Sequence, residues 1–124
     1  MSQQILVVDD SGDMRDLLHI FLDGASYRLI DATEGAEALA LLDQHPIRAI
    51  ICDLHMPGMD GYDLLKAVRA EPRFQRLPFL ILTGSNDSNE KAQCLAAGAD
   101  AWITKPFSPS VIRAELERLC KDPD

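Results

Sequence analysis

Short apolar runs alternate with longer stretches of helical periodicity from one end of the chain to the other. Five of the runs contain little polar alternation, which is typical of parallel strands buried on both faces. The second run is the weakest, and we expect it at an edge of the sheet. The predicted strands are Ile5–Val8, Tyr27–Ile30, Ile47–Cys52, Pro78–Leu82 and Ala101–Thr104.

Each predicted strand is followed by apolar residues at helical spacing, with start and stop signals beside them. Predicted N-caps are Ser11, Thr33, Asp87 and Ser108, and Glu90 resembles the partner of Asp87 in a capping pair. The helices are expected through Met14 to Leu22, through Ala36 to Leu42 before Pro46, through Tyr62 to Ala70, from Asp87 to Gly98, and through Ile112, Leu116, Leu119 and Cys120.

Five strand-then-helix units with short connections predict an α/β fold. Parallel neighbours need right-handed crossovers, so the helices are expected to cover both faces of one five-stranded sheet. The natural strand order is 2-1-3-4-5, which is flavodoxin-like, and residues 1–124 are expected to form one domain. In this order the first and third strands meet at the topological switch point, where ligands bind at the carboxyl ends of strands.

Composition and charge disfavour several classes of function and location. The chain has 124 residues, 47% of them hydrophobic and 26% charged, as in an ordinary globular domain. A net charge of −8 disfavours direct nucleic-acid binding. No apolar run approaches the roughly 20 residues of a membrane span, and residues 1–4 do not resemble a signal peptide. Three cysteines without metal or redox spacing are expected as reduced thiols, which favours the cytoplasm.

Polar residues stand where the predicted strands end. Asp9 and Asp10 follow the first strand, Asp53 follows the third, Thr83 follows the fourth and Lys105 follows the fifth. Neighbouring strands lie about 4.8 Å apart, so the carboxylates that end the first and third strands must nearly touch. The long stem of the lysine can span the remaining distance. These residues are therefore expected to converge on one pocket.

Three crowded carboxylates repel one another unless a cation lies between them. An all-oxygen site of this kind suits Mg²⁺ or Mn²⁺. A divalent cation facing Lys105 and Thr83 could hold a phosphoryl group, because the two cations neutralise its oxygens and the hydroxyl donates a hydrogen bond. One carboxylate could then attack phosphorus.

Several stretches in register resemble the receiver domain of two-component response regulators of the single-domain CheY-like kind. They are VVDDSGDMR, IICDLHMPGMDGYDLL, LTGS and AAGADAWITKPF, and they cover essentially the whole chain in order. The resemblance implies that Asp53 accepts a phosphoryl group from a phosphohistidine, with Mg²⁺ held by Asp10, Asp53 and the backbone carbonyl of His55. Asp9 would orient metal-bound water, and Thr83 and Lys105 would bind the phosphoryl oxygens.

The resemblance also implies a role in a phosphorelay or two-component system. The donor would be a histidine kinase or histidine phosphotransfer protein, and a target protein would bind the face formed by the fourth helix, fifth strand and fifth helix. Trp102 matches the switch aromatic, His55 and Ser85 match positions that tune dephosphorylation, and the Lys105-Pro106 bond is expected to be cis. The module would catalyse only its own phosphorylation and dephosphorylation, as a monomer or a weak phosphorylation-dependent dimer.

Other interpretations of the same residues remain open. Trp102 could be half-buried packing, and His55 could be an exposed loop residue. A haloacid-dehalogenase phosphatase needs a second aspartate two residues after its nucleophile, where this chain has Ser11 and Gly12, and a flavodoxin needs a phosphate loop that is not acidic. A docking module that works without phosphorylation is the main alternative, although such pseudo-receivers typically lose the acceptor, an acid or the lysine.

Overall fold

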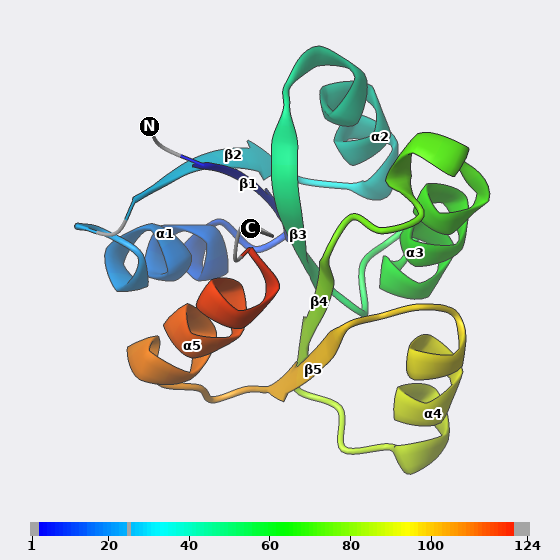
Figure 1. Cartoon of the computed structure of the whole chain (residues 1–124). Helices are drawn as coiled ribbons and strands as arrows, with labels where there is room; N and C mark the ends of the chain where they lie inside the picture. The colour runs from blue at the N-terminus through cyan, green and yellow to red at the C-terminus, as the bar shows by residue number, and fades with distance from the viewer. Residues whose placement is uncertain (1–2, 25, 121–124) are drawn as a thin grey trace.

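In the computed structural model, which describes residues 3–24 and 26–120, five parallel strands form one sheet in the order β2-β1-β3-β4-β5. This is the order that the sequence predicted (Figure 1). The edge strand β2 is only partly buried, again as predicted. The strands are β1 (Gln3–Val8), β2 (Tyr27–Ala32), β3 (Ile47–Asp53), β4 (Phe79–Thr83) and β5 (Ala101–Thr104).

Helices cover both faces of the sheet. Figure 1 shows α1 and α5 on one side and α2, α3 and α4 on the other. The helices are α1 (Gly12–Phe21), α2 (Gly35–Gln44), α3 (Gly61–Ala70), α4 (Ser88–Ala96) and α5 (Pro109–Leu119), with a short 3-10 helix η1 (Pro72–Phe74) that the sequence did not predict. None of the helices in the described part of the chain is long and apolar enough to cross a membrane.

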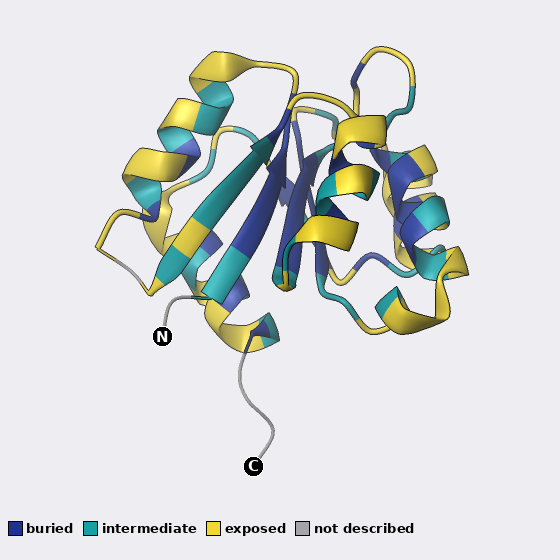
Figure 2. Ribbon diagram, turned by 90° about the horizontal axis from the view of Figure 1, so that it is seen from above, coloured by how far each residue is buried: buried dark blue, intermediate teal, exposed yellow. Residues whose placement is uncertain are grey.

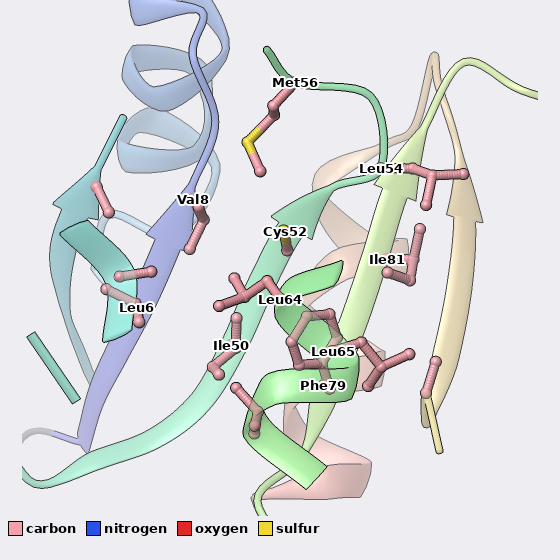
Figure 3. Close-up of a cluster of buried hydrophobic side chains, with 14 of the residues drawn as sticks. Leu6, Val8, Ile50, Cys52, Leu54, Met56, Leu64, Leu65, Phe79 and Ile81 are labelled. Atoms are coloured by element: carbon pink, nitrogen blue, oxygen red, sulfur yellow. The ribbon is translucent and has the colours of Figure 1, made fainter. Parts of the chain in front are cut away.

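Side chains that alternate along each strand divide the core into two layers. On β1, Leu6 and Val8 face the cluster beneath α2, α3 and α4, whereas Ile5 and Val7 face the cluster beneath α1 and α5. Figure 2 shows the middle strands buried and the outer surfaces of the helices exposed. In Figure 3, Cys52 and Phe79 of the first cluster lie among the side chains of α3. Each fully buried aliphatic side chain contributes about 1.5–3 kcal/mol to folding, so both layers stabilise the sheet.

Most of the predicted helix ends are confirmed. Ser11 and Ser108 accept hydrogen bonds as N-caps of α1 and α5. Asp60 forms a capping box with Asp63 at the start of α3. Gly98, with a φ of +110°, follows α4, where glycine tolerates the left-handed backbone.

Two capping predictions are wrong. The N-cap of α2 is Glu34 rather than Thr33, because the Thr33 amide and hydroxyl both donate to a Glu37 carboxylate oxygen, at 2.6 and 3.0 Å. Asp87 does cap α4, accepting from the amides of Asn89 and Glu90. The Glu90 carboxylate, however, does not return to Asp87, because it accepts a hydrogen bond from Ser85 Oγ instead.

Candidate functional site

The strand register brings the predicted site residues to one end of the sheet. Val8 pairs with Cys52, so that Asp9 comes next to Asp53 where β1 and β3 end. Asp53 itself pairs with Leu82, and Thr83 follows one residue further along β4. The carboxyl ends of the three central strands therefore place both aspartates and the threonine together.

Three carboxylates form a compact oxygen cluster at this end. Oxygen atoms of Asp9, Asp10 and Asp53 all lie within 4.8 Å of one another. Asp9 is only 2% exposed, and one of its oxygens accepts a hydrogen bond of 2.9 Å from the Ser11 amide, whereas Asp10 is exposed. Hard oxygen donors at this separation suit a magnesium-sized cation that retains some of its water. The residues present therefore fit the divalent cation that the sequence predicted.

Lys105 supplies a positive charge to the same cluster. Its amide donates a hydrogen bond of 2.8 Å to the Thr83 carbonyl, so Lys105, which follows β5, lies beside the end of β4. Its Nζ lies 3.7 Å from Asp9 Oδ2 and 3.7 Å from Asp53 Oδ1. The side chain is 24% exposed, so the ammonium group reaches the carboxylates from a partly solvated position.

The charge state of Asp53 reflects its surroundings. Burial raises the pKa of the Asp53 carboxyl above its ordinary value of 3.8. Lys105 and a hydrogen bond from the His55 backbone lower this pKa, while the carboxylates of Asp9 and Asp10 raise it, and the net shift is upward. A carboxylate held under these conditions gains from any cation or proton that relieves the repulsion.

Thr83 is completely buried at the end of β4. Its Oγ1 accepts a hydrogen bond of 3.1 Å from the Ser85 amide, which leaves the hydroxyl proton free to be donated elsewhere. Trp102 pairs with Ile81 in the register of β4 and β5 and is half-buried against the α2–α3–α4 side of the core. The structure thus brings Thr83 to the acidic cluster and leaves Trp102 at the sheet edge.

Comparison with known sequences decides the family. Residues 5–117 match the family model of the response regulator receiver domain. The chain belongs to the response regulator receiver domain family. Receiver domains are signalling modules of two-component systems.

Individual relatives agree with this assignment. Chemotaxis protein CheY1 of Helicobacter pylori strain J99 is 38% identical over 116 residues, which cover 92% of this chain and 94% of that protein. Response regulator GtcR of Aneurinibacillus migulanus is 39% identical over 122 residues, or 95% of this chain, but the chain spans only 49% of its length. The receiver domain thus matches both a relative of its own length and one about twice as long.

A solved structure supports the same fold. The receiver domain of the sensor histidine kinase PA1611 from Pseudomonas aeruginosa PAO1 superposes with a TM-score of 0.89 at 26% identity. The match covers 98% of this chain and 100% of that one. That protein was solved with a magnesium ion coordinated in its active site cleft.

Gly61, at the start of α3, supports the site but was not predicted from the sequence. A Cβ on Gly61 would stand 2.5 Å from the Asp53 carbonyl oxygen and 2.8 Å from the Leu54 Cα. The Gly61 amide also donates a hydrogen bond of 2.8 Å to the Leu54 carbonyl. Only glycine lets the start of α3 approach the acceptor strand this closely. A signal was present, since Pro57-Gly58 marks a tight turn nearby, but the residue against which Gly61 packs depends on the tertiary fold.

The cis Lys105-Pro106 bond expected from the resemblance is present. His55 and Ser85 come two residues after Asp53 and Thr83 in the chain. Their side chains do not stand alone, because both contact Glu90 of α4. From its spacing Glu90 was expected only as a capping residue, so its contact with His55 and Ser85 was not predicted.

Proposed function

We propose that this receiver domain is a phosphorylation-dependent switch in which Asp53 is the phosphoacceptor. The observation that carries the proposal is the position of the Asp53 carboxylate, which lies within 4.8 Å of carboxylate oxygens of Asp9 and Asp10 and 3.7 Å from the ammonium group of Lys105. Asp53 is 13% exposed in its side chain, so a small phosphodonor can reach it from solvent.

The transfer is a nucleophilic displacement at phosphorus. A carboxylate oxygen of Asp53 forms a bond to the phosphorus of a phosphohistidine, the phosphorus–nitrogen bond breaks, and its electron pair leaves with the imidazole, which takes up a proton. The product is a mixed anhydride, an aspartyl phosphate. Lys105 offsets the charge of its oxygens, and Thr83 donates the hydroxyl proton that remains free.

The acidic cluster is the proposed metal site. Asp9, Asp10 and Asp53, with the backbone carbonyl of His55, would hold Mg²⁺, and Mn²⁺ would fit the same donors. When bound, the cation supplies positive charge that offsets both the crowded carboxylates and the transferred phosphoryl oxygens. The magnesium ion in the similar domain of PA1611 supports this assignment.

The partners follow from the same proposal. A histidine kinase or histidine phosphotransfer protein would donate the phosphoryl group, and a target protein would bind the face formed by α4, β5 and α5. Leu95 of α4 and Val111 of α5 are large hydrophobic residues that are 44% and 45% exposed on these elements. A hollow of about 360 Å³ between β5 and α5 is lined in part by Trp102 and Phe107, which offers apolar contacts to such a target. The proposed receiver unit covers residues 1–124.

A docking module that works without phosphorylation would not need the complete set of Asp53, Thr83 and Lys105. All three lie at one end of the sheet, two of them as charged groups and Thr83 as a buried hydroxyl. A structural role alone would favour apolar replacements, because buried charges cost free energy. The phosphoacceptor proposal accounts for the whole set.

Intact mass spectrometry after incubation with acetyl phosphate and Mg²⁺ tests the proposal. We expect the mass of the wild type to increase by one phosphoryl group, Asp53→Asn to stay unmodified, and EDTA to suppress the reaction. Asp16→Asn makes the same chemical change on the exposed face of α1 and should label normally. Labelling of Asp53→Asn at the wild-type rate would show that the acceptor is another residue.

A further inference from the structure

Glu90 in the first turn of α4 connects two loops that follow different strands. One of its oxygens, Oε1, accepts a hydrogen bond of 2.6 Å from Ser85 Oγ in the loop after β4. The other, Oε2, lies 3.3 Å from His55 Nε2 in the loop after β3. The carboxylate thus forms a bridge, which we call the His55–Glu90–Ser85 bridge, across the end of the sheet.

Both loop residues also contact the phosphorylation site through their backbone. The backbone of His55 lies beside the Asp53 carboxyl and lowers its pKa. The Ser85 amide donates to Thr83 Oγ1 at 3.1 Å. The bridge joins the side chains of the same two residues, so Glu90 links the two loop segments whose backbone lies beside Asp53 and Thr83.

This role does not compete with helix capping. Asp87 already accepts from the amides at the start of α4, and its own amide donates to Ser85 Oγ at 3.1 Å. The Glu90 carboxylate is therefore free for the two loops, and its side chain is 32% exposed. Ser85 is held from two sides, by the Asp87 amide and by Glu90.

The position of the His55 side chain depends on the bridge more strongly than that of Ser85. Its side chain is 60% exposed, and within the described residues Glu90 is its one ion-pair or hydrogen-bond partner among the side chains. A hollow of about 100 Å³ beside the bridge is lined in part by Asp60, Tyr62 and Gln93. This space would let the imidazole change position when the carboxylate no longer holds it.

We propose that Glu90 is a positioning residue that holds His55 and Ser85 beside the acceptor and thereby sets the lifetime of the aspartyl phosphate. The inference rests on the proposed function, because it concerns the same site. With the bridge in place, the two loops are closed against each other and limit the approach of water to phosphorus. Without it, the imidazole and the β4–α4 loop move apart, and water attacks the anhydride more readily.

The rate of dephosphorylation provides the test. Each protein is labelled with acetyl phosphate and Mg²⁺, the donor is removed, and loss of the phosphoryl mass is followed with time. We expect Glu90→Ala to shorten the lifetime by about three- to tenfold, which corresponds to losing one hydrogen-bonded contact in the ground state. Glu90→Gln keeps an acceptor for Ser85 and an amide for His55, so it should restore most of the wild-type lifetime although it lacks the charge.

Two controls separate the bridge from general effects. Glu117→Ala removes the same charge from the exposed face of α5 and should leave the lifetime unchanged. In a double-mutant cycle, His55→Ala and Glu90→Ala should be non-additive, because each removes the same contact. Amide NMR signals of His55 and Ser85 should shift in unphosphorylated Glu90→Ala and stay in place in Glu117→Ala.

The possible outcomes are distinct. If the wild type never becomes labelled, the proposed function fails and takes this inference with it. If the wild type labels normally and Glu90→Ala has an unchanged lifetime, only the positioning role of Glu90 is overturned. Equal shortening in Glu90→Gln and Glu90→Ala would likewise overturn the bridge and assign the effect to charge.

Discussion

Gly61 packs directly against the acceptor strand, since a Cβ at this position would stand 2.5 Å from the carbonyl oxygen of Asp53. The neighbouring atoms are backbone, so they cannot move aside as the end of a flexible side chain would. We expect Gly61→Ala to displace the start of α3, to lower the free energy of unfolding by about 1–3 kcal/mol, and to slow phosphorylation by acetyl phosphate.

Chemical denaturation and the labelling rate measure the two effects. Gly84→Ala is the matched control for stability, because nothing lies within 4 Å of a Cβ built there. Gly84→Ala should therefore change the free energy of unfolding by less than about 0.5 kcal/mol. A Gly61→Ala protein with wild-type stability would show that α3 can shift without cost.

Asp53→Asn should stabilise the metal-free protein at neutral pH. Burial raises the pKa of this carboxyl in the folded state, so the unfolded state loses its proton first as pH increases. Stability therefore falls as pH rises from the ordinary pKa of 3.8 through the raised folded value, and the penalty is complete above it. The side-chain amide introduced by Asp53→Asn does not ionise, so it carries no such penalty.

Thermal melting in EDTA across this pH range measures the difference. The advantage of Asp53→Asn should be greatest at neutral pH and should disappear as pH falls below 3.8, where the carboxyl is protonated in both the folded and the unfolded state. Asp16→Asn, on the exposed face of α1, should show no comparable trend. An Asp53→Asn protein less stable than the wild type at neutral pH contradicts the crowded-carboxylate description.

Lys105→Met should destabilise the protein most strongly when no metal is present. The substitution keeps the apolar stem but removes the ammonium group 3.7 Å from both the buried Asp9 and Asp53. We expect a loss of about 1–3 kcal/mol in EDTA, because a buried carboxylate is left without its counter-charge. Mg²⁺ should recover part of this loss.

Urea denaturation with and without Mg²⁺ follows the change. Lys66→Met is the control, because its Nζ lies 3.9 Å from Asp63 in an exposed pair one turn apart on α3. Such surface pairs contribute about 0–1 kcal/mol. Equal effects of the two substitutions would mean that Lys105 is only a solvated surface charge.

Trp102 should report the conformational change through its fluorescence. The indole is half-buried on β5, beside the hollow between β5 and α5, and it is the only tryptophan of the chain. If Thr83 moves toward a phosphoryl oxygen, the space beside it favours a more buried indole, and the population of that arrangement rises. Emission should then change in intensity or shift to shorter wavelength.

Emission spectra recorded with Mg²⁺ and beryllofluoride or acetyl phosphate test for this conformational change. Mg²⁺ alone should change the emission less. Asp53→Asn should abolish the donor-dependent part, and Thr83→Ala should reduce it while labelling continues. Unaltered emission from protein shown by mass to be phosphorylated would leave Trp102 as packing only.

Much of the fold follows from local patterns. The apolar runs and the caps at Ser11, Asp87 and Ser108 depend on residues near one another in sequence, and they predicted the elements to within a few residues. Strand order followed from the right-handed crossover rule, which applies to any such alternation. Because parallel strands end at one edge, the clustering of Asp9, Asp53 and Thr83 was predictable too.

What the sequence could not decide is which of two chemically reasonable partners a polar group takes. Glu90 has the spacing of a capping residue for Asp87, yet its carboxylate contacts Ser85 and His55. Gly61 shows no reason for being glycine until the backbone of Asp53 lies against it. Both outcomes depend on how closely separate loops approach in three dimensions, whereas caps and periodicity act within a single turn. The sequence by itself therefore determined the elements, their order and the acidic cluster, and only tertiary packing decided which neighbours support that cluster.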